Sequence, residues 1–143
     1  MNEINVSPSE WEVMRVIWAT NPITSKEVSE ILKEKKGWKL STTKTLIGRL
    51  VKKGMITSEA KGRKYEYSPI VSQEERIRDM IEEFLNQVCA TKIGEIIKIM
   101  LENNELSLSD IEELEKILQA KKIAAPEEVV CDCIPGQCDC MIQ

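Results

Sequence analysis

Apolar residues in the first third of the chain recur at the spacing of amphipathic α-helices. The first pattern places Trp11, Met14 and Trp18 at i, i+3 and i+7, and predicts a helix that runs to about residue 19. Ser7 and Glu10 form an S-x-x-E capping box ahead of it. The two tryptophans could stack on bases, but their spacing is more typical of core packing, so we expect them in the core.

Two further helices are predicted before residue 55. The second helix begins at a capping box of Thr24 and Glu27 and ends near Gly37, which can serve as its C-terminal cap. The third is expected to be capped by Ser41 and to end at Gly54. Its inward face is an apolar stripe of Leu46, Ile47, Leu50 and Val51.

Residues 55–59 and 64–68 have the composition and alternation of β-strands. The four residues between them place Lys61 and Arg63 around Gly62, which predicts a turn with a basic tip. Three helices followed by such a hairpin predict a winged helix-turn-helix. Pro69 ends the second strand, so we place the end of this DNA-binding domain near residue 70.

From residue 72 the pattern changes to three short, acidic amphipathic helices, of which the first and the third are expected to be capped by Ser72 and Ser109. Three such helices have few ways to bury their apolar faces alone. Pairing with the same helices of a second chain, in a two-fold dimer, is therefore favoured over an internal helical bundle. The predicted fold is mainly α with a small β-hairpin. It comprises a winged helix domain (residues 1–70), a helical dimerisation domain (71–122), and a linker with a metal-binding tail (123–143).

Charge divides along the same boundary. Residues 1–70 carry 13 Lys and Arg against 8 Asp and Glu, whereas residues 71–143 carry 7 against 16. A basic first half fits a polyanion, although ordinary surface solvation would give similar numbers. The chain has no signal-peptide pattern at its start and no apolar run of about 18 residues, so we expect a cytoplasmic protein without membrane contact.

The outward face of the third helix offers hydroxyls and cations, with no acidic residue between Ser41 and Gly54. Lys and Arg can contact guanine acceptors or phosphates in a major groove, and Thr can contact base edges or phosphates. A solvated basic helix is the alternative, but the basic hairpin beside it favours DNA binding. The candidate DNA-binding residues are Ser41, Thr42, Lys44, Thr45, Arg49 and Lys52 on the helix and Lys61, Arg63 and Lys64 on the wing.

The candidate metal ligands lie near the C-terminus, where Cys131, Cys133, Cys138 and Cys140 form two C-x-C pairs. Pro135 and Gly136 between the pairs predict a chain reversal that lets the four sulfurs converge. Four thiolates repel one another and would be stabilised by a thiophilic cation such as Cu(I) or Zn(II). In a reducing compartment such a cluster indicates metal binding rather than disulfides.

The fifth cysteine, Cys89, falls among apolar residues and is expected to be a buried small hydrophobe rather than a ligand. Other functions are less favoured by the sequence. The chain has no histidine, no glycine-rich phosphate loop and no carboxylate pair in an evident apolar pocket, so we do not expect an enzyme. A purely structural zinc site, another thiophilic metal, and a metal-storage module without specific DNA binding remain as alternatives.

Three segments resemble the BlaI/MecI penicillinase-repressor family. They are SEWEVMRVIW near the start, WKLSTTKTLIGRLVKKGMI across the third helix, and KGRKYEYSP in the hairpin. With the C-x-C-x4-C-x-C tail added, the whole chain resembles the copper-responsive CopY-type repressors of Gram-positive bacteria. BlaI/MecI proteins are inactivated by proteolysis between their two domains, but this chain has a sulfur tail that they lack, so that mechanism is not carried over.

This resemblance implies a homodimer that represses a copper-homeostasis operon encoding export ATPases and a copper chaperone. The implied operator is a pseudopalindrome of the form TACA-NN-TGTA. The zinc form, with one Zn(II) on the four tail cysteines of each chain, would hold DNA. Cu(I) from the chaperone would displace zinc, two coppers per tail, and release the repressor. Cys131, Cys133, Cys138 and Cys140 match that ligand set one for one.

Overall fold

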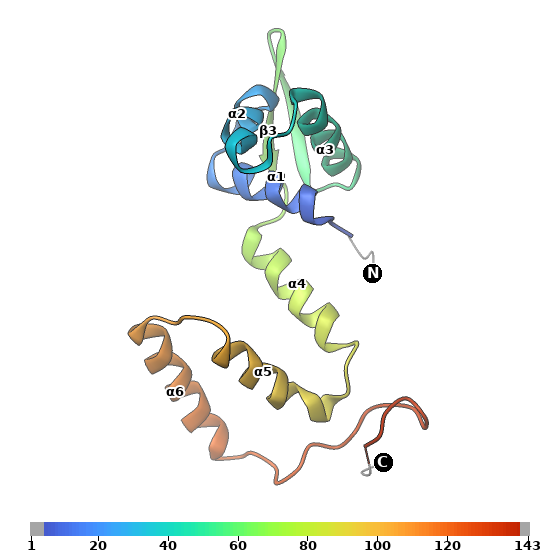
Figure 1. Cartoon of the computed structure of the whole chain (residues 1–143), viewed down its shortest axis with the longest axis vertical. Coiled ribbons are helices and arrows are strands. Elements are labelled where there is room, and N and C mark those ends of the chain that lie inside the picture. The colour runs from blue at the N-terminus through green and yellow to red at the C-terminus, as the bar shows by residue number, and fades with distance from the viewer. Residues whose placement is uncertain (1–4, 141–143) are drawn as a thin grey trace. The chain divides into compact units, whose positions relative to one another are not determined.

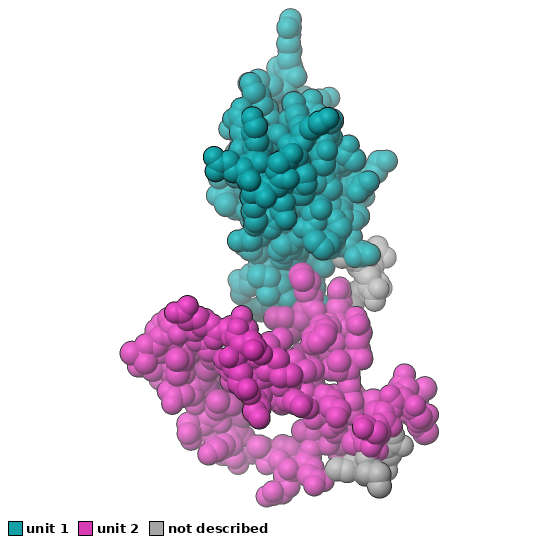
Figure 2. Space-filling model, viewed as in Figure 1, with its two compact units in different colours: residues 1–79 teal, residues 80–143 magenta. Residues whose placement is uncertain are grey.

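The computed structural model describes residues 5–140 and divides the chain into two compact units, residues 1–79 and 80–143 (Figure 2). The first unit contains α1 (Pro8–Ala19), β1 (Ile23–Thr24), α2 (Ser25–Lys36), α3 (Leu40–Lys52), β2 (Ile56–Lys61) and β3 (Lys64–Pro69). Helix α4 (Gln73–Leu85) spans the boundary between the units. The short 3-10 helix η1 (Ala90–Lys92), α5 (Ile93–Glu102) and α6 (Leu108–Lys122) follow. No helix among the described residues is both long and apolar enough to cross a membrane.

The three N-terminal helices pack around one apolar core and against a three-stranded antiparallel sheet in the order β1-β3-β2 (Figure 1). The core takes its side chains from every element of this unit except β3 and is completed by the loop before β2: Val13, Met14, Val16, Ile17, Ile23, Val28, Leu32, Leu46, Ile47, Leu50, Met55 and Ile56. The hairpin of β2 and β3 projects beyond the helices (Figure 1). This arrangement is the winged helix that the sequence predicts.

The helix boundaries follow from local capping. Ser7 with Glu10, and Thr24 with Glu27, each form a complete capping box at the start of α1 and α2, as predicted. Gly37 ends α2 with φ 65°, a left-handed conformation that glycine adopts without a Cβ clash. Trp18 packs against the core, and its indole N–H donates to the Val71 carbonyl at 2.9 Å.

Two predicted caps are each wrong by two residues. Helix α3 begins at Leu40 with Lys39 as its N-cap, because the Lys39 carbonyl already accepts from the backbone N–H groups of residues 42 and 43. Ser41 therefore lies in the first turn rather than at the cap. Helix α6 is capped by Ser107, whose hydroxyl accepts from the Asp110 N–H at 3.1 Å, and Ser109 lies inside the helix.

The hairpin differs in detail from the sequence prediction. The strands extend to Lys61 and Lys64, which pair with each other, so the turn contains only Gly62 and Arg63. Gly62 has φ 64°, which is the positive value required at the first central position of a type II′ turn. The strand β1 was not predicted, because its two residues are too short to show any alternation.

The second unit has no comparable core. Among the described residues from 80 onward, Cys89 is the only buried hydrophobic residue. The apolar faces predicted for the helices of this region are instead open, with exposed fractions of 36–55% at Ile77, Ile81, Phe84, Ile97, Met100, Leu101, Ile111, Leu114, Ile117 and Leu118. Three helices with open apolar faces need another surface to cover them.

A buried ion pair links the start of α1 to the end of α3. The Glu10 side chain is 2% exposed, and its Oε1 accepts from Lys53 Nζ at 2.7 Å and from the Ser7 N–H at 2.9 Å. Burial alone would raise the pKa of Glu10, but these two partners outweigh it and the pKa is lowered. The pair therefore stabilises the fold where Glu10 is ionised.

Replacing Lys53 with Met should lower the free energy of unfolding by about 2 kcal/mol at pH 7, because the buried carboxylate loses its cation. A carboxyl whose pKa is lowered by folding stabilises above its unfolded pKa of about 4.3 and loses that contribution as pH falls through the folded value. The difference between the variant and the wild type should therefore shrink below about pH 4. Urea unfolding followed by tryptophan fluorescence measures this difference in the free energy of unfolding, because Trp11, Trp18 and Trp38 all lie in the first unit.

The matched control is Lys52→Met, one residue away on the exposed face of α3, for which we expect a change within about 0.5 kcal/mol. Equal small effects of the two substitutions would show that the Glu10–Lys53 pair does not stabilise the fold.

Candidate metal centre and DNA-binding surface

Four cysteine sulfurs gather in the second unit. The Sγ atoms of Cys89, Cys131, Cys133 and Cys138 all lie within 4.8 Å of one another. Cys131 Sγ is 3.4 Å from Cys138 Sγ and 3.5 Å from Cys89 Sγ. All five cysteines are free thiols, and no disulfide links them. The cluster joins the tail to the segment between α4 and α5.

A tight turn brings the tail sulfurs together. The Gln137 N–H donates to the Ile134 carbonyl at 3.1 Å, and the Ile134 N–H donates to the Gln137 side-chain carbonyl at 3.1 Å. Between them, Pro135 and Gly136 occupy the central positions, and Gly136 has φ 94°. Proline followed by a glycine with positive φ is the type II arrangement. The predicted chain reversal is confirmed.

Predicted and observed sulfur sets differ at two residues. Three of the four tail cysteines belong to the group, whereas Cys140, half-buried, lies outside it. Cys89 takes the fourth place. It is 8% exposed, as expected for a buried residue, but it contacts sulfur. Sequence spacing could not show this, because Cys89 stands 42 residues from Cys131 and no motif joins them.

The environment of each thiol decides its charge without metal. The Thr91 hydroxyl, 3.0 Å from Cys89 Sγ, and the Thr91 backbone lower the pKa of Cys89 to about 6. Burial and the neighbouring thiols of Cys89 and Cys138 raise the pKa of Cys133 to about 11. The Cys133 N–H favours a thiolate at Cys131, but the adjoining Cys138 thiol, burial and the Cys89 thiol outweigh it and raise the pKa of Cys131.

A negative charge on one sulfur of this cluster therefore disfavours the ionisation of a neighbouring thiol. A divalent cation at the centre would offset the repulsion, and its binding would release protons from the thiols that remain protonated. The sulfur spacing suits such a cation: Zn–S bonds of about 2.3 Å place tetrahedral sulfurs about 3.8 Å apart. A hollow of about 640 Å³ opens beside the cluster, and Lys92 and Asp139 are among its lining residues. It offers a path by which an ion could reach the sulfurs.

The candidate DNA-binding surface lies on α3 and the wing. All nine predicted residues are exposed: Ser41, Thr42, Lys44, Thr45, Arg49, Lys52, Lys61, Arg63 and Lys64. Within residues 5–140, Lys44, Arg49, Lys52 and Arg63 form no ion pair, so their charges are not neutralised by the protein. Lys61 lies 3.4 Å from Glu59, with both side chains more than half exposed. The surface therefore presents cations to any polyanion.

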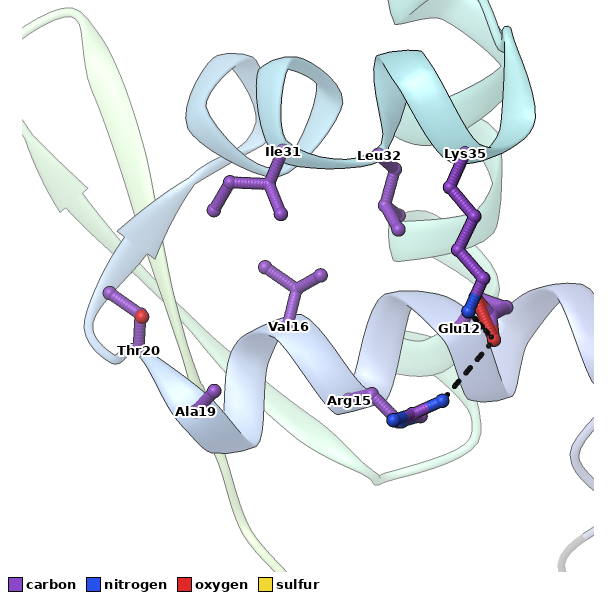
Figure 3. A pocket seen from close by; sticks show the side chains of 8 residues that line it. All are labelled: Glu12, Arg15, Val16, Ala19, Thr20, Ile31, Leu32 and Lys35. Atoms are coloured by element: carbon purple, nitrogen blue, oxygen red, sulfur yellow. Dashed lines mark hydrogen bonds and ion pairs between the residues drawn. The ribbon is translucent and has the colours of Figure 1, made fainter.

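Another hollow lies between α1 and α2, with a volume of about 270 Å³ (Figure 3). Val16, Ile31 and Leu32 line its apolar part. At its other end Lys35 and Arg15 both approach the Glu12 carboxylate, at 2.7 and 3.8 Å (Figure 3). Its one carboxylate is already paired and it contains no sulfur, so we assign it no ligand.

Comparison with known proteins identifies the family of the chain. The family model described as penicillinase repressor matches residues 6–120. The chain belongs to the penicillinase repressor family. Membership in a family of DNA-binding repressors confirms that it is not an enzyme, and the predicted resemblance to BlaI/MecI repressors is confirmed at this level.

Relatives within the family extend this match. The chain is 39% identical over 139 residues to an uncharacterized 16.5 kDa protein from the ptsI 3′ region of Latilactobacillus sakei, covering 97% of this chain and 95% of that protein. It is 33% identical over 117 residues to the penicillinase repressor of Bacillus licheniformis, covering 82% of this chain and 91% of that protein. The solved structure of a CopR repressor is 44% identical over 48% of this chain and 99% of that one, with a TM-score of 0.42.

The family match includes Cys89 but not the tail cysteines. It ends at residue 120, before Cys131, whereas the match to the L. sakei protein covers 97% of the chain and so reaches into the tail. The tail thus lies outside the part of the chain that the penicillinase repressor model matches.

Proposed function

We propose that the chain is a copper-responsive transcriptional repressor. In its zinc-loaded form a dimer binds a pseudopalindromic operator of a copper-homeostasis operon, and Cu(I) that displaces zinc releases it. The observation that carries the proposal is a cluster of four cysteine sulfurs, three of them in the tail of a penicillinase repressor chain. A repressor needs a means of sensing its inducer, and three of these four sulfurs lie beyond residue 120, where the family match ends.

The DNA-binding half of the proposal rests on the first unit. Helix α3 would enter the major groove, with Ser41, Thr42, Thr45 and Arg49 near base edges and Lys44 and Lys52 near phosphates. Lys61, Arg63 and Lys64 on the wing would lie along the phosphate backbone. We assign DNA binding to residues 1–70, dimerisation to 71–122 and metal sensing to 123–143.

The dimer is supported by the open apolar faces of the second unit. Ile111, Leu114 and Leu118 form one stripe on α6, each 36–55% exposed. The same faces of a second chain would cover them and set two α3 helices at a fixed spacing, as a pseudopalindromic operator requires. Metal binding could act by altering this spacing between the two α3 helices.

The metal half rests on the preference of thiolates for soft cations. Zn(II) takes four thiolates in a tetrahedron. Cu(I) is softer and accepts two or three sulfurs, so the tail cysteines Cys131, Cys133, Cys138 and Cys140 can bridge two coppers. The change of geometry would move the tail, and a coupling of about 1–3 kcal/mol would change operator affinity roughly 5- to 150-fold. A copper chaperone in the cytoplasm would be the donor of Cu(I).

A purely structural zinc site, or a site for another thiophilic metal, is the second candidate. Four sulfurs within 4.8 Å of one another favour such a site as much as they favour the zinc form of the sensor. The two differ in what copper does to DNA binding.

Removal of residues 131–143 separates these candidates. The shortened chain keeps the winged helix and the three helices, so we expect it to bind a labelled TACA-NN-TGTA duplex but to ignore Cu(I). Fluorescence anisotropy under anaerobic conditions measures both properties, with the full chain as reference. Release of the shortened chain by Cu(I) would contradict the proposal, and an equal indifference of the full chain would support a structural site.

Substitutions on α3 and the wing test the DNA surface. Arg49→Ala should weaken operator binding by about 1–3 kcal/mol and reduce the preference for operator over a scrambled duplex. Arg63→Ala should weaken binding to both duplexes. It should also reduce, by about 1, the magnitude of the slope of log binding constant against log salt concentration. The matched control is Arg78→Ala, an exposed arginine on α4 paired with Glu74. If all three variants behave alike, this surface does not bind DNA.

A further inference from the structure

Cys89 brings a cysteine from the helical region to the tail sulfurs. It is the N-cap residue of η1, in the segment that connects α4 to α5. Its Sγ atom lies 3.5 Å from that of Cys131, and it completes the group of four sulfurs that excludes Cys140. The resemblance to CopY-type repressors implies zinc on the four tail cysteines alone, so this arrangement indicates a different set of zinc ligands.

We propose that Cys89 is a direct zinc ligand and that the zinc site consists of Cys89, Cys131, Cys133 and Cys138. The proposal rests on the metal-binding function proposed above and specifies its ligands. Cys140 then belongs to the copper form only, in which the four tail thiolates bridge two Cu(I) ions and Cys89 is set free.

The sulfur positions fit this set. Two sulfur pairs within it are separated by 3.4 and 3.5 Å, and all four atoms lie within 4.8 Å of one another. These distances bracket the spacing of about 3.8 Å in a zinc tetrathiolate. A small expansion of the closer pairs would therefore admit the ion without a change in the course of the chain.

A second contact holds the tail against the same segment. The Ala90 N–H donates to Asp132 Oδ1 at 2.9 Å. Asp132 is the residue between the first two tail cysteines, so the C-x-C spacing places a carboxylate over the first N–H of η1 while both sulfurs face Cys89. The Thr91 hydroxyl lies 3.0 Å from Cys89 Sγ, where it can donate a hydrogen bond to a metal-bound thiolate and hold that sulfur in place.

This ligand set supplies a physical connection between the metal and the helices. Zinc would fasten the tail to the segment between α4 and α5, whereas copper held by the tail alone would release it. A tail-only zinc site offers no such difference, because both metals would then leave Cys89 untouched.

The test compares full-length wild type with Cys89→Ser and Cys140→Ser, each loaded anaerobically with Co(II) and then with Zn(II). Sulfur-to-cobalt charge-transfer absorption counts the thiolates, and a competing chelator measures zinc affinity. We expect Cys89→Ser to lose about a quarter of the absorption, because one of four thiolates is gone. Loss of a residue that merely hydrogen-bonds to a metal ligand weakens metal binding roughly 10–100-fold, so we expect loss of a ligand to lower zinc affinity at least about tenfold. Cys140→Ser should match the wild type in both measurements.

Hydrogen exchange provides a second readout that does not depend on the absorption. Zinc should slow exchange in the peptide containing Ala90 in the wild type and in Cys140→Ser, but not in Cys89→Ser. Circular dichroism verifies that the near-isosteric variants keep their helices.

The reverse pattern, with Cys140→Ser impaired and Cys89→Ser like the wild type, would overturn the proposal and restore the tail-only site. Equal losses of cobalt absorption and zinc affinity in both variants would also contradict a zinc site made of Cys89, Cys131, Cys133 and Cys138. If the wild type itself bound no stoichiometric Co(II) or Zn(II), the proposed metal-sensing function would fail with it, which is a separate and recognisable result.

Discussion

Repulsion between thiolates is the constraint on which the second unit depends. Among the described residues from 80 onward, its buried hydrophobic residue is a cysteine, and three more sulfurs lie within 4.8 Å of it. The Thr91 hydroxyl and backbone lower the pKa of Cys89, whereas burial and neighbouring thiols raise the pKa values of Cys131 and Cys133. Under the proposal above, a soft cation would be held by these sulfurs and would tie the tail to the segment between α4 and α5. The remaining apolar faces of the unit stay open for a partner chain.

The first unit is independent of this constraint. Its core, the capping boxes of α1 and α2, and the buried Glu10–Lys53 pair fix three helices and a hairpin without metal. This stability matters for function, because a DNA-binding surface must keep its shape while the metal changes. A signal from the tail would then act on the relation between two rigid winged helices in a dimer rather than on the fold of either.

Most of the winged helix could be predicted from sequence, because its determinants are local. Capping boxes and the apolar periodicity of α1–α3 lie within a few residues of one another, as do the prolines and glycines that end each element. Details set by neighbours were missed: β1 exists only through its pairing with β3, and Lys39 rather than Ser41 begins α3. Cys89 was also missed as a partner of the tail. Its proximity to Cys131 depends on how a chain of more than forty residues returns on itself, which no motif records.

The most direct test of the central claim is a titration of the zinc-loaded full chain, bound to a labelled TACA-NN-TGTA duplex, with Cu(I) under anaerobic conditions. Anisotropy and released zinc are followed together. The account predicts that zinc leaves and operator binding is lost as copper approaches about two ions per chain, since four tail thiolates can bridge two Cu(I) ions. Operator binding that persists after all zinc has been displaced would contradict it.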